Sequence, residues 1–257
     1  MIDRYGRFIQ EELWGTHLRS APFISPSSVR LFGKEFFFPA TEDNEGKFGI
    51  LSLVDGIIRA DEYHAKEYIK EDAVVIDAGA NIGTFSVFAA TRAPKGHVYA
   101  FEPAKDTFAL LKKNTAGYPN ITVINMGLGD AVAQRTIFDM GEGAGGSVFE
   151  DSPFYGDVSQ KKGFHDSAAV VTLDGFAADH GLSRIDFIKI DTEGYERKIL
   201  EGGASVLGRF HPIVSMSAYH NADDKEVLPA MMRAADSRYI CKLYKDAEED
   251  MVCYINE

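Results

Sequence analysis

Polar residues follow two apolar runs of the sequence in a pattern that suits nucleoside binding. The run 74–78 leads into a turn that contains Gly79 and Gly83, and the run 97–101 is followed directly by Glu102. A glycine-containing turn after a strand exposes backbone N–H groups at a helix N-terminus, and an acid after the next strand can accept hydrogen bonds from ribose hydroxyls. This layout is typical of a nucleoside-binding βαβ unit.

The spacing of the turn selects among nucleoside-containing ligands. A dinucleotide site uses Gly-x-Gly-x-x-Gly, whereas Ala80, Asn81 and Ile82 separate the two glycines here. Asp77 precedes the turn, where its charge would repel a pyrophosphate. We therefore expect S-adenosylmethionine, a ligand with a zwitterionic arm and no phosphate. Asp77 would face its amino group, directly or through water, and Glu102 would bind its ribose.

The third apolar run ends in polar residues that could contact the adenine. Asn125 and Asp130 flank the end of this run, and either could bind the exocyclic amine, although an ordinary polar turn would have the same composition. The full set of expected cofactor-binding residues is Asp77, Gly79, Ala80, Asn81, Gly83, Glu102, Asn125, Gly129, Asp130 and Asp191.

Further charged residues lie in and after the apolar run 186–190. Lys189 is inside this run, and Asp191 and Glu193 follow it. Ligands of doubly wound sheets bind beyond the carboxyl ends of the strands, so we expect these residues at the mouth of the site. A buried lysine needs a carboxylate partner, which Asp174 or Asp191 could supply.

His220 follows the next apolar run, 213–218, and should reach the same mouth. A histidine near a carboxylate can serve as general base for a hydroxyl. We expect His220 or Asp191 to be the base and Glu193 to orient it or to bind the acceptor. There are two alternatives. These three residues could hold a divalent ion, although the sequence has no pair of histidines at helical spacing that would indicate one. They could also form an ion-pair cluster with a purely structural role.

The elements that position these residues alternate from residue 73 onward. Strands are expected at 74–78, 97–101, 121–126, 135–139, 169–172, 186–190, 213–218, 239–244 and 251–255, and helices at 84–92, 104–116, 195–207 and 224–237. Apolar strands joined by helices predict a parallel sheet covered on both faces. The short link between the last two strands suits a hairpin, so one edge strand should be antiparallel.

The first 60 residues differ from the rest and are expected to form an extension, followed by a cofactor-binding domain over 61–257. The extension would contain an amphipathic helix at 1–15 and a hairpin at 29–38 that turns at Gly33-Lys34, and a helix at 61–68 would lead into the domain. The extension could cap the acceptor or form a homodimer contact. The glycine-rich stretch 141–164 is expected to be a lid or binding loop.

Aromatic residues of these segments have two interpretations. They could line an apolar or sugar-stacking acceptor pocket, or fill the seam between the extension and the sheet. The residues are Trp14, Phe36, Phe37, Phe38, Phe154 and Tyr155.

Bulk composition narrows the class of protein. The net charge of -12 over 257 residues argues against nucleic acid as the main partner. Cys241 and Cys253 are expected to be buried thiols in a reducing cytosol. No apolar stretch reaches the length of a transmembrane helix and no signal-peptide core is present, which predicts a soluble cytoplasmic protein without a membrane partner.

Taken together, four motifs resemble those of the FkbM family of S-adenosylmethionine-dependent methyltransferases. They are Val75 to Gly83, Phe101-Glu102-Pro103, Thr172-Leu173-Asp174 and Lys189 to Glu196, and the likeness spans roughly residues 60 to 220. The resemblance implies a Rossmann-like class I fold, with a mostly parallel seven-stranded sheet and an antiparallel C-terminal strand. It also implies O-methylation of a hydroxyl on a sugar, polyketide or other secondary metabolite, that is, a small-molecule or glycan acceptor.

One position departs from the family pattern. The strand before Tyr219-His220 carries Ser215-Met216-Ser217, where an acid is expected. If that acid is catalytic in other members of the family, its role must pass to Asp191, Glu193 or His220 in this chain.

Other function classes remain as rivals. A nicotinamide-dependent oxidoreductase would need the tighter glycine turn. A non-catalytic S-adenosylmethionine-binding module would bind the cofactor without turnover, and the polar set Lys189, Asp191, Glu193 and His220 argues against it. Methylation of a nitrogen or a carboxylate is compatible with the sequence.

Overall fold

The computed structural model describes residues 28–38, 53–139, 146–152, 165–245 and 249–256. The helix expected at residues 1–15, Trp14, Phe154, Tyr155 and most of the stretch 141–164 lie outside these ranges. None of the helices in the described ranges is long and apolar enough to cross a membrane.

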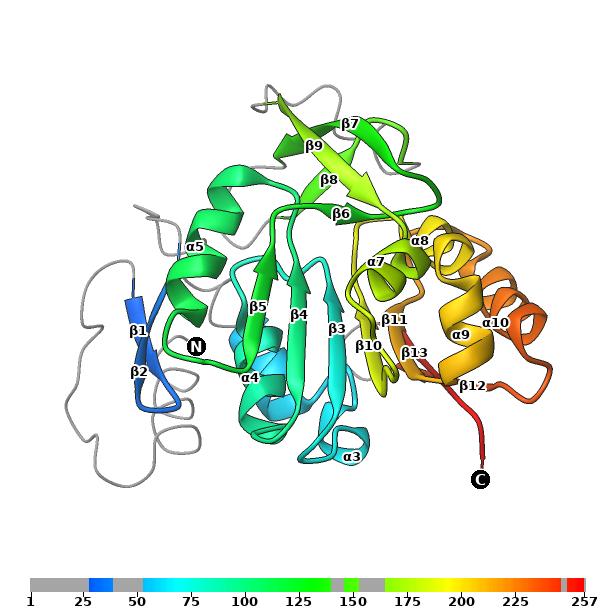
Figure 1. Cartoon of the computed structure of the whole chain (residues 1–257), viewed down its shortest axis with the longest axis horizontal. Coiled ribbons are helices and arrows are strands. Elements are labelled where there is room, and N and C mark those ends of the chain that lie inside the picture. Colours follow the sequence, from blue (N-terminus) through cyan, green and yellow to red (C-terminus); the bar gives the residue numbers. More distant parts are fainter. Residues whose placement is uncertain (1–27, 39–52, 140–145, 153–164, 246–248, 257) are drawn as a thin grey trace.

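Seven strands form a central sheet in the order β12-β13-β11-β10-β3-β4-β5 (Figure 1). Their bounds are β3 Val74–Ala78, β4 His97–Phe101, β5 Ile121–Ile124, β10 Phe187–Ile190, β11 Ile213–Ser217, β12 Ile240–Lys245 and β13 Glu249–Tyr254. The five strands from β5 to β11 pair in parallel, and β13 runs antiparallel to both of its neighbours. The expected mostly parallel seven-stranded sheet with an antiparallel C-terminal strand is confirmed.

The position of the antiparallel strand differs from the expectation of an edge strand. β13 inserts between β11 and β12, so that β12 forms the edge. Burial explains this order, because β13 is buried over its four central residues whereas β12 alternates exposed and half-buried residues. The more apolar strand of the hairpin therefore takes the interior position.

The two faces of the sheet are covered by different helices. On one face, Val75 packs in a cluster with α4 (Thr84–Arg92) and with segments from the N-terminal part of the chain. On the other face, Ile76 and Ala78 pack with the helices that follow residue 172. Those helices are α7 Leu173–Asp179, α8 Glu196–Gly202, α9 Ala204–Phe210 and α10 Asp224–Ala235. The near-continuous burial of β3 follows from its having helices on both sides.

Most predicted helices are present, and the pattern at 104–116 appears as α5 (Lys105–Thr115). One difference is that the pattern predicted at 195–207 is divided at Gly203 into two helices, α8 and α9. Helix α7 was not predicted, although Thr172 forms its N-cap by accepting from the backbone N–H of Gly175.

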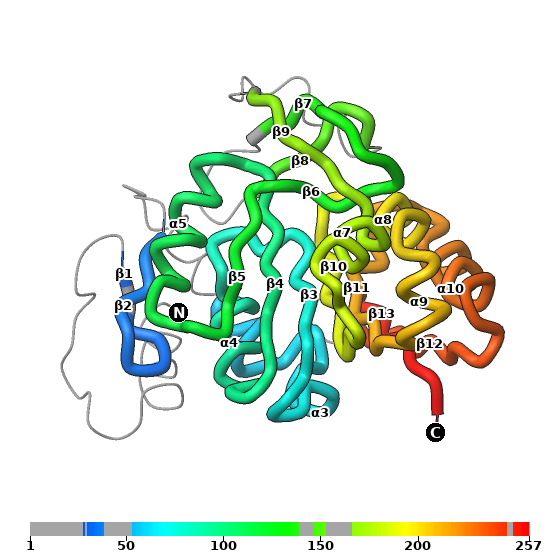
Figure 2. Tube along the Cα trace, in the orientation of Figure 1, coloured from blue at the N-terminus to red at the C-terminus, as the bar shows by residue number. Residues whose placement is uncertain are grey.

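A second sheet lies above the carboxyl-terminal ends of β3, β4 and β5 (Figure 1). It has four strands in the order β6-β9-β7-β8, which are β6 Gly127–Leu128, β7 Ala133–Asp139, β8 Ser147–Phe149 and β9 His165–Val171. Two of the predicted strands belong here, and β6 and β8 were too short to show a pattern. Figure 2 shows the chain leaving β5, passing through this sheet and returning by β9 to the central domain.

The segments before β3 pack against the sheet and its helices. The predicted hairpin is formed by β1 (Ser28–Leu31) and β2 (Lys34–Phe37), and its turn is Phe32-Gly33, one residue earlier than expected. Both turn residues have positive φ, as the favoured two-residue hairpin turn requires. Phe36 and Phe38 are buried in the cluster with α4, which supports the seam interpretation for these two aromatics.

The segment that leads into β3 is only partly as expected. A single π-helical turn, η1 (Asp55–Ala60), precedes a short helix, α3 (Ala65–Tyr68). Between η1 and α3, Asp61 and His64 have left-handed backbone conformations. The predicted helix therefore begins at residue 65 instead of 61. The domain boundary at residue 60 stays a prediction.

The two cysteines form a disulfide, which corrects the prediction of free thiols. Cys241 of β12 lies directly opposite Cys253 of β13, with their Cα atoms 4.0 Å apart. The hairpin register produces this pair, and register was not part of the sequence argument.

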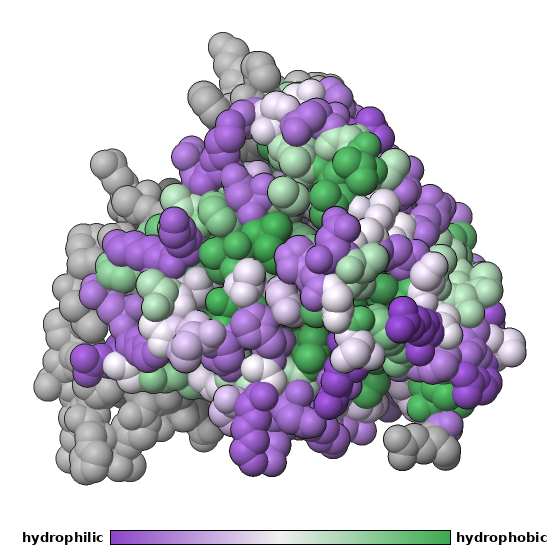
Figure 3. All heavy atoms as spheres, in the orientation of Figure 1, coloured by the Kyte–Doolittle hydropathy of each residue, from purple (hydrophilic) through white to green (hydrophobic). Residues whose placement is uncertain are grey.

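The molecular surface seen in Figure 3 is mostly hydrophilic along its lower edge. Hydrophobic side chains reach this surface over the second sheet and near the carboxyl ends of the central strands (Figure 3). Exposed apolar residues include Val132 and Met126, on the segments that join β5 to β7.

Candidate active site

A cleft opens where the carboxyl ends of β3, β4 and β10 face the second sheet. Its empty space is about 790 Å³, including the part open to solvent. Backbone and polar lining comes from Gly79, Ala80, Asn81, Thr84, Glu102, Pro103, Thr107, Gly127, Gly146, Ser147, Lys189, Asp191, Thr192 and Glu193. Apolar and aromatic lining comes from Leu53, Ile57, Tyr63, Phe85, Phe101, Leu128 and Phe149.

One end of the cleft, which we call the turn end, is formed by Gly79, Ala80, Asn81 and Glu102. The backbone N–H groups of Gly79 and Ala80 donate to the carbonyl of Phe101, which fixes the turn against the end of β4. Gly79 and Asn81 have φ of 75° and 49°. Asparagine tolerates this region better than most residues, which suits the sequence to the turn.

Gly79 has a packing reason beyond its φ. A Cβ at this position would lie 2.0 Å from the backbone oxygen of Asp191, so the exit of β10 crosses directly over the turn. The sequence argument assigned the close approach at Gly79 to a ligand. The structure shows that another strand makes it.

Glu102 is almost fully buried at the turn end. Its Oε2 accepts from the backbone N–H of Asn81 at 3.0 Å, and its Oε1 accepts from that of Ala104 at 2.9 Å. Burial raises the pKa of Glu102 to about 7, against the opposing effect of these hydrogen bonds. A carboxylate oxygen has more than one lone pair, so both oxygens can still accept from hydroxyl groups of a ligand.

A buried hydroxyl next to the turn has no partner. Thr84 begins α4 and lines the cleft, and its Oγ1 makes no hydrogen bond within the part of the chain that the structure describes. Buried polar atoms are nearly always paired, so this hydroxyl, on a residue that lines the cleft, is a candidate contact for a ligand group.

Lys189 and Asp77 form a buried ion pair beside the turn. Lys189 Nζ lies 3.3 Å from Asp77 Oδ1 and donates to the backbone oxygen of Gly79 at 2.6 Å. The other oxygen of Asp77 accepts from Ser86 Oγ at 2.5 Å. Burial lowers the pKa of Lys189, but the charges of Asp77 and Asp191 outweigh burial and raise it. The ammonium group is therefore charged and held in place.

The expected partner of Lys189 was Asp174 or Asp191. Its ion-pair partner is Asp77 instead, and the charge of Asp191 also acts on it. Parallel pairing of β10 with β3 places Lys189 opposite Asp77. Asp174 is elsewhere: its carboxylate accepts from the backbone N–H groups of Ser205 and Val206 and caps α9. Asp77 does not line the cleft, and its predicted role toward a cofactor amino group stays a prediction.

Asp191 is the first residue after β10 and is oriented by two hydroxyls. Its Oδ2 accepts from Tyr63 Oη at 2.7 Å and its Oδ1 from Ser217 Oγ at 3.0 Å. Burial raises the pKa of Asp191, but the charges of Lys189 and His220 and these hydrogen bonds lower it below its ordinary value. The carboxyl group is therefore ionised at neutral pH.

Sequence reasoning missed Tyr63, which lines the cleft between Asp191 and Phe85. Its hydroxyl bonds to Asp191 across 128 positions of sequence, and its ring packs edge-to-face on Phe85. No local pattern marks such a residue, because it precedes the first motif and its partner lies far along the chain.

A second part of the site, which we call the ionic end, consists of Asp191 and Glu193, which line the cleft, and of Glu196 and His220, which are buried behind Glu193 and do not line it. His220 Nε2 lies 3.4 Å from Glu193 Oε2, and its Nδ1 lies 3.1 Å from Glu196 Oε1. Burial lowers the pKa of His220, but the two glutamates outweigh burial and raise it to about 11. His220 is thus an imidazolium at neutral pH.

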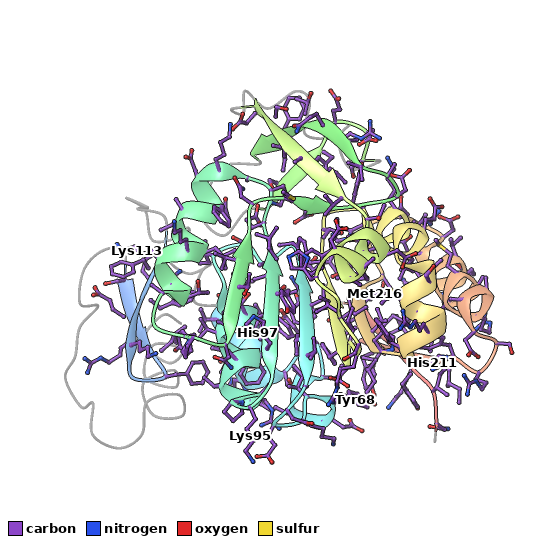
Figure 4. All side chains as sticks on the ribbon, in the orientation of Figure 1. Tyr68, Lys95, His97, Lys113, His211 and Met216 are labelled. Atoms are coloured by element: carbon purple, nitrogen blue, oxygen red, sulfur yellow. A yellow bond between two sulfur atoms is a disulfide. The ribbon has the colours of Figure 1, made fainter. Side chains whose placement is uncertain are left out.

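This raised pKa is unfavourable for the predicted role of His220 as general base, and that role stays a prediction. A protonated imidazole has no lone pair with which to accept a proton. The burial of His220 between two carboxylates, which the sequence did not reveal, is the physical reason. Two of the other histidines lie on elements away from the cleft: His97 begins β4, at the amino end of that strand, and His211 follows α9 (Figure 4).

Besides Asp77, four of the predicted cofactor-binding residues do not line the cleft. A Cβ on Gly83 would meet Leu111 of α5, and one on Gly129 would meet Val170 and Tyr195. These glycines allow close packing between elements.

The polar pair of this group also lies away from the cleft. Asn125 donates to the backbone oxygens of Glu102 and Pro103, and Asp130 is solvent-exposed. Gly127 and Leu128, between them in the sequence, do line the cleft. An adenine contact by Asn125 or Asp130 stays a prediction.

Among the described residues, no group of three or more His, Cys, Asp and Glu side chains is arranged to hold a metal ion. The three residues considered for such an ion, Asp191, Glu193 and His220, are joined by ion pairing and hydrogen bonding to protein groups instead.

Comparisons with known proteins identify relatives of this chain. Residues 77–239 match the model of the methyltransferase FkbM domain. The hexuronic acid methyltransferase AglP of Haloferax volcanii is 30% identical over 188 residues, which cover 72% of each chain. The 31-O-demethyl-FK506 methyltransferase FkbM of Streptomyces tacrolimicus is 32% identical over 152 residues, covering 50% of this chain and 58% of that enzyme.

A solved structure supports the fold. The crystal structure of methyltransferase FkbM from Methylobacillus flagellatus KT superposes with a TM-score of 0.54 at 18% identity, over 82% of this chain and 55% of that one. The strand order of the central sheet, the cleft at its carboxyl edge and the match over residues 77–239 lead to one conclusion. The chain belongs to the FkbM family of methyltransferases.

Proposed function

We propose that this chain transfers the methyl group of S-adenosylmethionine to a hydroxyl oxygen of a sugar or other small-molecule or glycan acceptor. The observation that carries the proposal is the combination, in one cleft, of a nucleoside-type turn end with a partly exposed carboxylate, Glu193, at the ionic end. The printed names of two relatives, a hexuronic acid methyltransferase and a 31-O-demethyl-FK506 methyltransferase, support an oxygen acceptor.

The turn end fits the nucleoside part of this cofactor. Glu102 has two oxygens that can accept from the ribose hydroxyls, and the unpaired hydroxyl of Thr84 lies beside it along the cleft lining. Gly79, Ala80 and Asn81 offer backbone instead of bulky side chains to the ligand. These features supply acceptors and a donor where a nucleoside with an amino-acid arm needs them.

The ionised groups around the cleft fit the charge of the cofactor. Asp77, Asp191, Glu193 and Glu196 outnumber the cations Lys189 and His220. S-adenosylmethionine supplies an electrophilic methyl group on a sulfonium cation. A site with net negative charge attracts such a cation and loses that attraction once the methyl group has been transferred, which favours product release.

The same charge favours a neutral hydroxyl over a carboxylate as acceptor. An acceptor carboxylate placed at the ionic end would face the carboxylates of Asp191 and Glu193, and like charges repel. A hydroxyl can instead donate its hydrogen to one of these carboxylates. The residues would orient the hydroxyl oxygen toward the methyl group and receive its proton.

Apolar side chains beside the ionic end would contact the body of the acceptor. Leu53 and Ile57 come from the segment at η1, and Phe149 comes from β8 of the second sheet. Because these residues lie outside the nucleoside motifs, we propose that they determine which acceptor enters.

The test is methyl transfer from radiolabelled S-adenosylmethionine to a panel of sugars, uronic acids, uronic acid methyl esters and polyketide alcohols. We expect label in a product that resists mild alkali, as a methyl ether does. Label released as methanol by mild alkali would indicate a methyl ester and so a carboxylate acceptor. Cofactor binding without turnover on any acceptor would favour the non-catalytic module.

A further inference from the structure

The buried carboxylate of Glu196 is a feature of the ionic end that the proposed function does not use. Glu196 begins α8 and has no exposed surface. Its Oε1 accepts from the backbone N–H and the hydroxyl of Thr192 and lies 3.1 Å from His220 Nδ1. Its Oε2 is buried without a partner among the described residues.

These contacts indicate that Glu196 is retained for its charge. A glutamine would keep the hydrogen bonds that Oε1 accepts from Thr192, so a purely structural role needs no carboxylate. A buried carboxylate with one unpaired oxygen is costly unless a cation compensates it. The cation at this place is His220, because the nearby Arg197 pairs with Asp223 and Asp224 instead.

His220 in turn fixes the carboxylate that faces the cleft. Its second ring nitrogen points to Glu193, which is the partly exposed member of the chain Glu196–His220–Glu193. Glu193 is also held through its backbone, whose φ is 53° and whose carbonyl accepts from Ser152 Oγ at 2.7 Å. The carboxylate is therefore anchored by an ion pair behind it and by a constrained turn.

Of the three residues considered as bases, Glu193 has the most favourable position. His220 is buried between two carboxylates and Asp191 is held by the hydroxyls of Tyr63 and Ser217, whereas the side chain of Glu193 lines the cleft and is 26% exposed. The geometry points to Glu196 as a positioning residue that holds His220 as an imidazolium, so that the His220–Glu193 pair leaves Glu193 as the base for the acceptor hydroxyl. This inference rests on the proposed function.

The step balances without any further reactant. An oxygen lone pair of the acceptor forms the new O–C bond, the C–S bond breaks and its electron pair stays on sulfur. The oxygen becomes strongly acidic as it bonds to carbon, and its proton passes to the carboxylate of Glu193, which later returns it to solvent. A carboxylate is a sufficient base for a proton whose acidity rises in this way.

The charged groups that face His220 come from two segments. Asp191 and Glu193 lie in the segment after β10, and Glu196 lies on α8. All three are carboxylates, and all three favour the protonated ring, in agreement with the raised pKa of about 11. Replacing one of them should weaken this preference without abolishing it.

The deciding experiment is an NMR titration of the histidine side chains in the protein without ligands. The His220 signals are assigned from their absence in His220→Asn. We expect both ring nitrogens of wild-type His220 to stay protonated to pH 9.5. In Glu196→Gln the midpoint should fall by about 1 to 3 pH units, the usual effect of an adjacent opposite charge.

A matched control is Glu201→Gln, the same change at an exposed position of α8, which should leave the titration of His220 unaltered. A wild-type midpoint near the ordinary value of about 6.5 would overturn the inference, whether or not Glu196→Gln folds. An unchanged midpoint in folded Glu196→Gln would overturn the role of Glu196.

Kinetics with an acceptor test the base. Glu193→Gln should lower kcat by about 10²–10⁴-fold, the usual contribution of a general base, with unchanged affinity for S-adenosylhomocysteine. Glu196→Gln should retain more activity than Glu193→Gln. Its activity should fall toward high pH, because His220 is deprotonated there in this variant. Glu201→Gln should have the activity of wild type. Full kcat in Glu193→Gln would overturn the assignment. The titration uses no ligand, so failure of this inference is distinguishable from failure of cofactor binding or turnover.

Discussion

At the turn end of the cleft the chain presents mainly backbone, whereas at the ionic end it presents ionised side chains. The turn end comes from two short segments, Gly79–Asn81 and Glu102, which directly follow the adjacent strands β3 and β4. The ionic end brings together Asp191, Glu193 and Glu196 with His220 from the next strand along the chain, and Tyr63 from far earlier in the sequence. Both ends contain motifs of the family, but the turn end is formed by local sequence, whereas the ionic end depends on contacts between separate segments of the chain.

Lys189 joins the two ends, and its removal should have the largest effect. It is buried against Asp77 and also donates to Gly79 at the turn end. Lys189→Met leaves a buried charge uncompensated and should lower the free energy of unfolding by about 3–5 kcal/mol in urea titrations. Adding Asp77→Asn should restore part of the loss.

The control is Lys95→Met, which removes an exposed ion pair with Glu71 and should cost less than about 1 kcal/mol. Equal losses in the two single variants would show that Lys189 is not the buried link between the ends.

The contact of Gly79 with Asp191 is the second point where the ends meet. Gly79→Ala combines a positive φ with a Cβ that would lie 2.0 Å from a backbone oxygen. We expect it to lower the free energy of unfolding by more than about 3 kcal/mol and to weaken binding of S-adenosylhomocysteine. Gly181→Ala is matched, because Gly181 has φ of 59° with open space around it. Gly181→Ala should lower the free energy of unfolding by only about 1 kcal/mol. A similar loss in both variants would contradict the close contact between Gly79 and the backbone of Asp191.

The charge state of His220 should make the stability contributed by the ionic end depend on pH. Folding raises its pKa from 6.5 to about 11. The stabilisation is therefore complete below pH 6.5 and is lost as pH rises toward 11. Between pH 7 and 9 the free energy of unfolding should fall by up to about 1.4 kcal/mol per pH unit.

Urea unfolding at pH 7, 8 and 9 measures this slope, and Glu196→Gln should reduce it while Glu201→Gln should not. A free energy of unfolding that stays constant or rises over this range would contradict a protonated His220.

Glu102 provides the corresponding test at the turn end, with the smallest expected effect. Glu102→Ala should weaken binding of S-adenosylhomocysteine by about 1–3 kcal/mol, the range for lost charged hydrogen bonds. Asp106→Ala, an exposed acid on the neighbouring helix α5, should bind as wild type does.

The raised pKa of Glu102 adds a pH signature. Its carboxyl group is neutral below pH 7 and ionised above it, so affinity in wild type should increase from pH 6 to pH 8. Glu102→Gln should not show this increase. Equal affinity at both pH values in wild type would mean that Glu102 does not accept from the ribose.

The contrast between the ends also explains what the sequence could predict. β3, β4 and α4 were located to the residue, because each has an uninterrupted apolar pattern and a clear breaker. Gly79–Asn81 and Glu102 were identified because a local motif encodes them. The partners of Lys189 and His220 depend on strand register and on helix α8, which no local pattern specifies.

The same reasoning accounts for the remaining errors. β13 took an interior position and the cysteines paired because hairpin register is a tertiary property. Tyr63 was overlooked because its function depends on a partner in another part of the sequence.

The most direct test of the central claim is calorimetric titration of the purified protein with S-adenosylmethionine, S-adenosylhomocysteine and NAD. The account predicts micromolar binding of the first two ligands and none of NAD, with both affinities reduced in Glu102→Ala. Binding of NAD alone, or of none of the three, would contradict it.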